Sequence, residues 1–323
     1  MDSAGSAVRV GSPDGLRYRS DRSPEALHDR DRGRDDRPPA AIGRDATLEL
    51  VFERRGGRTI VAHAYAEPPY RIGQSFAIDD AAYIIIVCAG PGVFAGDRLH
   101  QSIRVERGAR VVLTSQSALQ VHPSIPQLRP KPDATVDGVS EAIVRHDYTV
   151  DDDAELHCHW DPVIPFTDAA LIQEFDLHLA PNARLYWSDA LMSGRVSRGE
   201  AWRFRELAHR LRLRIAGVLT YLERYRLSRD DGSLRRRWVA DAANYFATTL
   251  VHHPRATADE SEALQRRLDT MTRARAAIDL LQPQLMIGRV MASEGPAFAA
   301  TRAAIRAALL DTVFQKPALA GRK

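Results

Sequence analysis

Residues 82–97 read A-Y-I-I-I-V-C-A-G-P-G-V-F-A-G-D, an apolar run followed by three glycines within seven residues. The apolar run is typical of a buried strand, and Gly90, Gly92 and Gly96 predict a turn that exposes its backbone. From Asp97 to Glu106 polar and apolar residues alternate, which predicts a second strand. This stretch therefore predicts a strand, a tight corner and another strand, the local pattern of a β-rich chain.

The same pattern of short strands and turns extends from Thr47 to about Phe246. Its plainest example is Arg210–Ile215, in which apolar residues alternate with three arginines, so one face of this strand is apolar and the other basic. Short, closely spaced strands favour an all-β sandwich, barrel or solenoid over β-α-β units. We therefore expect a mainly β protein.

The last quarter of the chain changes to the period of a helix. Leu264 and Leu268 recur at helical spacing, and the pattern predicts helices over about 258–276 and 296–314. A strand over about 284–291 is expected between them. The two helices should therefore follow the strands near the C-terminus.

The first 45 residues have a different composition from the rest of the chain. They are rich in aspartate, arginine, glycine and proline and poor in large apolar residues. Such a segment cannot bury enough apolar surface to fold by itself. We therefore expect a disordered extension over 1–45 and a single β-rich domain over 46–321.

Composition limits the class of protein. The chain has 323 residues, of which 44% are hydrophobic, and only two cysteines, Cys88 and Cys158. The hydrophobic residues are enough for a sizeable core, and two cysteines are too few for a disulfide framework. No apolar run approaches the roughly 18 to 20 residues that cross a bilayer, and the first residues lack the order of a secretory signal. A cytoplasmic protein without membrane contact is the expectation.

The sequence pI of about 9.0 raises the question of nucleic-acid binding. The basic charge is local, because thirteen arginines stand against five acidic residues between Arg195 and Ala240. This segment has no lysine and few interleaved aromatic residues. Such a face is more typical of protein docking or of a solvated strand than of a nucleic-acid module. No nucleic-acid partner is expected, although a basic nucleic-acid-binding module remains an alternative.

The three glycines of the opening stretch also resemble a dinucleotide-binding fingerprint. A nucleotide-dependent enzyme is therefore a second alternative. A Rossmann turn opens a helix and is followed by an acidic residue about 20 positions later, and the sequence offers neither feature. No lysine-serine or lysine-threonine pair follows Gly96, which argues against a P-loop. A tight corner that presents Asp97 is the preferred interpretation.

A second group of candidate residues surrounds Cys158. His157 and His159 would share one face of a strand and Cys158 the opposite face. Two histidines do not make a metal site, and no further ligand stands at zinc-like spacing. Structural or surface histidines are favoured over a transient contact with a soft metal.

Acidic residues supply the remaining candidates. Gly194–Glu200 predicts a glycine-bounded turn with two arginines and a carboxylate, either a hairpin with an internal ion pair or a functional site. Glu223 lies among apolar residues as a paired core group or a functional acid. No serine-histidine-aspartate elbow, H-E-x-x-H motif or carboxylate pair predicts catalysis, so we expect no enzyme.

Taken in order, these motifs resemble those of the UreD family of urease accessory proteins, also called UreH, over about Thr47–Gly321. The resemblance rests on residues Arg58-Thr59, Gly90-Pro91-Gly92, Gly96-Asp97, Leu113-Thr114-Ser115-Gln116, Val121-His122, Leu156, Ile164-Pro165-Phe166, Trp187-Ser188-Asp189, Gly194-Arg195 and Gly199-Glu200. Each motif is weak alone, and their order and spacing are specific together.

The resemblance implies a non-enzymatic chaperone that docks on the urease apoprotein with a UreF-type protein and a UreG-type GTPase. It implies nickel in transit and no permanently bound cofactor. It also implies a helical, solenoid-like stack of short strands with two helices near the C-terminus.

Family members are thought to contain an internal polar passage for nickel. Matched residue by residue, the resemblance suggests Asp97, Asp189, Glu200 and Glu223 as waypoints for the cation. Spaced single carboxylates suit transit better than a closed cage of soft ligands. The residues expected to shape the turns around them are Gly90, Gly92, Gly96, Gly194, Arg195 and Gly199.

Overall fold

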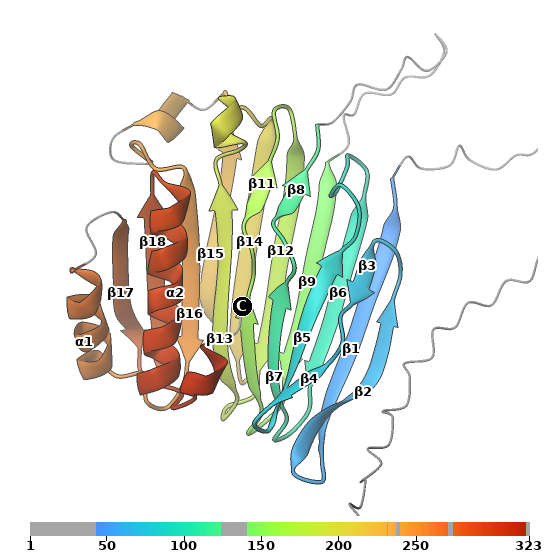
Figure 1. Ribbon diagram of the computed structural model, residues 1–323, viewed down its shortest axis with the longest axis vertical. Helices are drawn as coiled ribbons and strands as arrows, with labels where there is room; N and C mark the ends of the chain where they lie inside the picture. Colours follow the sequence, from blue (N-terminus) through green and yellow to red (C-terminus); the bar gives the residue numbers. More distant parts are fainter. Residues whose placement is uncertain (1–42, 124–140, 231, 237–239, 271–273, 321–323) are drawn as a thin grey trace, which may run out of the picture. The chain divides into compact units, whose positions relative to one another are not determined.

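The computed structural model describes residues 43–123, 141–230, 232–236, 240–270 and 274–320 (Figure 1). Most of the predicted disordered extension over 1–45 lies outside these residues. Its last three residues are described, and Asp45 is already the first residue of strand β1 (Asp45–Arg55).

The strands of these described ranges form two sheets. The first contains seven strands in the order β15 (Val218–Ser228), β14 (Glu206–Ile215), β12 (Ala170–Leu179), β9 (Ala142–Val150), β6 (Arg98–Val105), β1 and β2 (Arg58–Ala66). The second contains eleven strands. Its main path is β17 (Arg275–Gln282), β18 (Leu285–Ala292), β16 (Tyr245–His252), β13 (Arg184–Met192), β10 (Glu155–His159), β7 (Arg110–Ser115), β5 (Ala81–Cys88) and β3 (Tyr70–Ile72), and β4 (Phe76–Ile78), β8 (Leu119–Val121) and β11 (Val163–Pro165) pair beside it.

From β5 to β14 the chain passes back and forth between the two sheets, with the short strands β8 and β11 remaining in the same sheet as β7 and β10, so the chain winds as a coil. Strands of successive turns pair in parallel and in register. Within the seven-stranded sheet one row runs through Phe52, Val105, Val150, Leu179 and Ile215. Such a row stacks apolar side chains of one turn directly on those of the next. The prediction of a mainly β, solenoid-like stack of short strands is confirmed.

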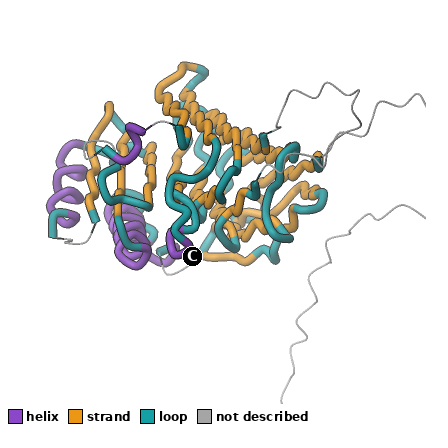
Figure 2. The backbone as a smooth tube through the Cα atoms, turned by 90° about the horizontal axis from the view of Figure 1, so that it is seen from above, coloured by secondary structure: helices purple, strands orange, loops and turns teal. Residues whose placement is uncertain are grey.

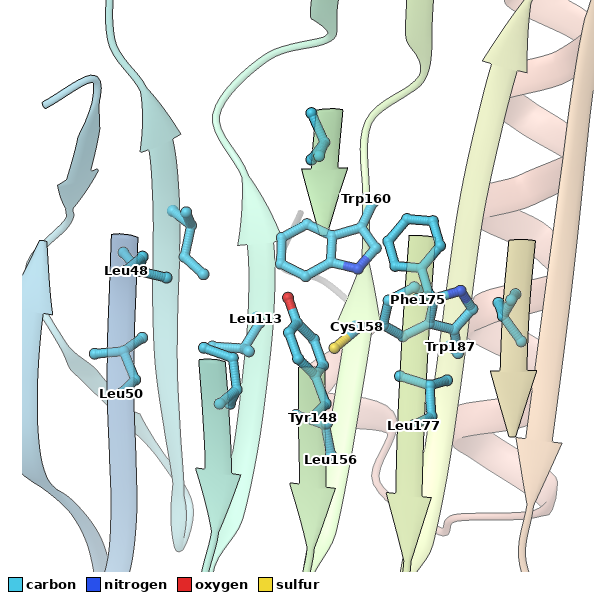
Figure 3. Packing of buried hydrophobic residues seen from close by; sticks show 14 of the residues in the cluster. Leu48, Leu50, Leu113, Tyr148, Leu156, Cys158, Trp160, Phe175, Leu177 and Trp187 are labelled. Carbon is cyan, nitrogen blue, oxygen red and sulfur yellow. The ribbon is translucent and has the colours of Figure 1, made fainter. Parts of the chain in front are cut away.

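The core lies between the two sheets, where the inward faces of their strands meet. Figure 3 shows Tyr148, Cys158, Trp160, Phe175 and Trp187 gathered there. The Trp187 ring makes edge contacts with Phe175 at 4.9 Å and with Tyr148 at 5.7 Å between ring centroids. These large rings hold the sheets together by burial and by aromatic contact.

Strand β14 shows how the sequence pattern sets this packing. Leu211 and Leu213 are fully buried in the core, and Arg210, Arg212 and Arg214 lie on the outer face of the sheet. The alternation predicted for Arg210–Ile215 is therefore observed as a division between core and surface.

Two α-helices lie at one end of the strand stack, next to β16, β17 and β18 (Figures 1 and 2). They are α1 (Ala258–Leu268) and α2 (Gly295–Thr312), and the hydroxyl oxygen of Thr257 accepts a hydrogen bond from the backbone of Glu260 at the start of α1. Three short 3-10 helices complete the described elements: η1 (Val196–Arg198), η2 (Gly232–Arg235) and η3 (Pro317–Leu319). No helix of the described residues is both long and apolar enough to cross a membrane.

Helix α1 is shorter than the 258–276 expected from the sequence. It ends at Leu268, and Arg275 already belongs to β17. The side chain of Asp269 accepts a hydrogen bond from Gln265, and the hydroxyl of Thr270 donates one to the carbonyl of Arg267. Such local bonds compete with helix propagation. The expected strand is β18, and the second helix begins and ends within two residues of the predicted bounds.

Candidate functional site

In the described part of the chain, two adjoining cavities lie between the sheets. The first has a volume of about 310 Å³ and is lined from both sheets by residues of β13, β14, β15, β16 and β18. The second has a volume of about 110 Å³ and extends toward the glycine corner at Gly90 and Gly92. Both are lined by Gln173, Asp189 and Ala190, so they adjoin at Asp189.

Asp189 occupies a core position of β13. It follows Trp187 by two residues and therefore points toward the same inter-sheet face. Its side chain is 14% exposed, and its Oδ2 lies 3.9 Å from Nε2 of His209. Burial, and to a lesser degree the negative charge of Glu223, raises the pKa of Asp189 to about 7. A carboxylate in this place is costly unless a cation or proton accompanies it.

His209 faces Asp189 from β14, and sequence reasoning missed it. Its ring stacks on Tyr225 with 4.6 Å between centroids, and neither ring nitrogen has a hydrogen-bond partner among the described residues. Burial lowers the pKa of His209 to about 4, so the imidazole is neutral near pH 7. The sequence could have indicated this residue, because His209 stands at an inward-facing position next to the alternating segment Arg210–Ile215.

Glu223 lines the first cavity from β15, the last strand of the seven-stranded sheet. Its Oε1 accepts a hydrogen bond from Nη1 of Arg289 at 2.7 Å, and its Oε2 accepts one from the Tyr221 hydroxyl at 2.9 Å. The hydroxyl of Thr248 is 3.3 Å from Oε2. Because Arg289 and Thr248 belong to the other sheet, these bonds join the two sheets. The sequence left Glu223 as a paired core residue or a functional acid, and it is paired.

The second cavity continues the polar lining beyond Asp189. Asp161, Ser115 and Gln101 line it, and the Ser115 hydroxyl donates a hydrogen bond to Asp161 at 3.0 Å. Carboxylates of Glu223, Asp189 and Asp161 thus follow one another along the two cavities. Asp161 was not among the residues expected from the sequence.

Asp97 lies at the glycine corner and lines neither cavity. Its carboxylate pairs with the Arg44 guanidinium and accepts hydrogen bonds of 2.9 Å from the backbone amides of Arg44 and Phe94. Burial alone would raise the pKa of Asp97, but these bonds outweigh it and lower the pKa. Arg44 also donates a hydrogen bond of 2.9 Å to the carbonyl of Gly92. Arg44 belongs to the segment expected to be disordered, so this pairing was not predictable from the sequence.

The corner itself needs glycine at Gly92. Its φ is +128°, and a β carbon there would lie 2.2 Å from the Gln120 carbonyl oxygen. After the corner the chain enters strand β6 and not a helix. A helix N-terminus that could hold a pyrophosphate is therefore not present at this corner.

Glu200 also lies outside both cavities. Its carboxylate pairs with Arg195, whose Nε lies 2.7 Å from Oε2, and this partner lowers the pKa of Glu200. The Arg195 guanidinium stacks 3.9 Å above the centroid of Phe166. The segment forms the 3-10 helix η1 and not a hairpin, and Gly199 follows it at a positive φ of 71°. The internal ion pair expected for this turn is observed.

His157 and His159 lie on one face of β10 and Cys158 on the other, as expected. His157 Nε2 lies 2.7 Å from Oε1 of Glu155, and its ring packs on Phe314 at 4.6 Å between centroids. Cys158 is buried in the inter-sheet core. Within the described ranges no three histidine, cysteine, aspartate or glutamate side chains are grouped to hold a metal ion.

Of the four carboxylates suggested as waypoints, the structure brings Asp189 and Glu223 to one cavity and places Asp97 and Glu200 elsewhere. The lining of the two cavities is therefore the candidate functional site.

Comparisons with known proteins agree with the motif series. The family described as "UreD urease accessory protein" matches residues 44–323. The chain is similar to a urease accessory protein UreD of Sorangium cellulosum, with 32% identity over 70% of both chains. It is also similar to UreD of Trichodesmium erythraeum, with 29% identity over 72% of this chain and 78% of that protein. A protein named UreH from Helicobacter hepaticus is 28% identical over 58% of this chain and 70% of its own length. This chain therefore belongs to the UreD family of urease accessory proteins.

Proposed function

We propose that this chain is a non-catalytic chaperone of urease maturation that carries nickel between its two sheets, from one cavity to the other. The observation that carries the proposal is the junction of the two cavities at Asp189, with Glu223 on one side and Asp161 on the other. Nickel is here the cargo and not a resident cofactor.

The arrangement of the ligands supports transit over storage. Carboxylate oxygens bind divalent cations, and a passage conducts when each site binds weakly enough to release the ion to the next. The described carboxylates of the cavities are spaced singly and are not gathered into a cage. The imidazole of His209, which has no hydrogen-bond partner in the described part of the chain, faces the junction and supplies a nitrogen donor beside Asp189.

The proposal rests on Asp189 and Glu223 among the four expected waypoints. Asp97 and Glu200 are each bound to an arginine outside the cavities. Their contacts support a role in shaping the corner and the turn near η1.

Docking on the urease apoprotein together with UreF-type and UreG-type proteins belongs to the same proposal. Membership of a family of urease accessory proteins supports joint action with urease. We place this action in the cytoplasm, where both thiols, Cys88 and Cys158, remain reduced.

The test is the nickel content of urease recovered from cells that carry single variants of this chain. Asp189→Asn and Glu223→Gln keep the shape of each side chain and remove its charge. We expect assembly with urease and the accessory proteins to persist and nickel per urease to fall at least about tenfold, because a cation loses a charged ligand in a buried site.

The matched control is Glu262→Gln, because Glu262 is a glutamate on α1 with 70% exposure. Its nickel loading should equal that of the unaltered chain. Full loading with both cavity variants would show that the cation takes another route. Normal urease activity in cells without this chain would refute the maturation role itself.

A further inference from the structure

The outer face of strands β12, β14 and β15 carries more arginines than its own carboxylates neutralise. Glu174 is shared by Arg145 and Arg210, at 2.9 Å and 2.7 Å. Asp176 is shared in the same way by Arg212 and Arg214. One carboxylate for two guanidinium groups leaves positive charge on this face.

Arg224 adds a charge that the described residues do not neutralise. It lies on β15 directly opposite Arg210 of β14, and like charges in this position destabilise a strand pair. The described chain offers no carboxylate within ion-pair distance of Arg224. The next outward residue, Arg226, pairs with Glu206 but is 71% exposed. Arg210 has Glu174 as its counter-ion, whereas Arg224 has none among the described residues, and this favours an anionic group from outside the chain beside Arg224.

These arginines lie around a hollow that Glu174 and two apolar residues also line. The hollow has a volume of about 520 Å³, and Ile172 and Ala208 lie on it together with Arg210, Arg224 and Arg226. The row Ile172–Ala208–Arg226 crosses the three strands in register, so the small side chain of Ala208 leaves the space between the arginines.

Exposed apolar side chains continue along the same strand. Val218, Leu219 and Leu222 are 67%, 48% and 51% exposed. Strand β15 is also the last strand of its sheet, and the edge of a sheet can accept a further strand. Charge, exposed apolar side chains and a sheet edge that pairs with no further strand among the described residues thus coincide on β15.

We propose that the edge and outer face of β15 form a docking surface for an extended, acidic segment of a partner protein. Added to β15, such a segment places alternate carboxylates beside Arg224 and Arg226 and its other side chains toward the opposite face. A second copy of this chain would bring arginine against arginine. Nucleic acid has no peptide backbone to pair with the edge of β15, and its phosphates would not match the exposed apolar side chains of this strand.

The test uses the full chain and a dye-labelled peptide of alternating glutamate and valine, with binding measured by fluorescence anisotropy. The double variant Arg224→Glu/Arg226→Glu should bind the peptide at least about tenfold more weakly, because like charges now meet at the interface. The matched control is Arg58→Glu/Arg98→Glu, which makes the same change of charge at two exposed arginines elsewhere in the seven-stranded sheet. The control should bind within about twofold of the unaltered chain.

Equal binding by the unaltered chain and the Arg224/Arg226 variant would overturn the proposal, as would no binding by the unaltered chain. Equal binding of a lysine-valine peptide, tighter binding of duplex DNA at the same salt, or self-association through β15 would also overturn it. The peptide assay involves neither nickel nor urease, so its outcome is independent of the proposed function.

Discussion

The buried carboxylate of Asp189, at the junction of the two cavities, should lower the stability of the folded chain. Removing its charge should raise that stability. In the folded chain its pKa is about 7, against an ordinary value of 3.8. A difference of this size corresponds to about 4 kcal/mol, at about 1.4 kcal/mol per pKa unit. Because the side chain is only 14% exposed, water screens little of this cost. We expect Asp189→Asn to increase the free energy of unfolding by up to about 4 kcal/mol at pH 8.

The pH dependence gives this prediction its sign. Below the ordinary value of 3.8 the carboxyl is protonated in both the folded and the unfolded chain, so the variant gains nothing there. Between that value and about 7 the unfolded chain loses the proton while the folded chain keeps it, and the stability of the unaltered chain falls as the pH rises. Above about pH 7 the cost is fully present. The gain from Asp189→Asn should therefore grow from acid toward neutral pH and then remain constant.

Urea unfolding followed by tryptophan fluorescence at a series of pH values measures this gain, since Trp187 lies two residues from the substitution. The control is Asp153→Asn, an aspartate with 62% exposure, whose effect should stay small at every pH. A gain for Asp189→Asn that is the same at pH 4 and pH 8, or a loss at pH 8, would refute the argument that the buried charge is uncompensated.

Three further substitutions test the surroundings. Gly92→Ala places a β carbon 2.2 Å from a backbone oxygen at a φ of +128°, so thermal unfolding should show a loss of about 2–4 kcal/mol, whereas Gly90→Ala, with open space around its β carbon, should lose less. Glu155→Gln removes the carboxylate that lies 2.9 Å from the ammonium group of Lys316. The free energy of unfolding in urea should fall by about 3–5 kcal/mol. An unchanged unfolding midpoint would contradict a stabilising role of this ion pair. Asp97→Asn removes a carboxylate whose pKa is lowered in the folded chain. The loss of stability should therefore be complete above the ordinary pKa of 3.8 and should disappear as the pH falls through the lowered pKa. A loss of stability independent of pH would exclude the ion pair as its cause.

Local patterns in the sequence were sufficient to predict a mainly β chain, the strand over Arg210–Ile215 and the glycine corner. The alternation over Arg210–Ile215 fits a half-buried strand in only one orientation, in which the leucines point inward and the arginines outward. The end of α1 was not predictable in the same way, because apolar spacing continued beyond Leu268 while local side-chain bonds stopped the helix.

The candidate site depended on contacts that no local pattern contains. Arg44 and Asp97 are 53 residues apart, and the former lies in a segment whose composition predicted disorder. Glu223 and Arg289 are 66 residues apart and belong to different sheets. Which carboxylates share a cavity follows from sheet order and register, and these are set by the whole stack.

The partners of the four carboxylates distinguish what each could do for a passing cation. Asp97, Glu200 and Glu223 each have a guanidinium group within ion-pair distance, and a cation that binds there must compete with that group. Asp189 faces the neutral ring of His209, and no described arginine or lysine lies within ion-pair distance of it. A divalent cation that reaches the junction therefore has only a proton to displace. If nickel follows the two cavities, the ion should stay longest at Asp189, and competition from Arg289 should shorten its stay at Glu223.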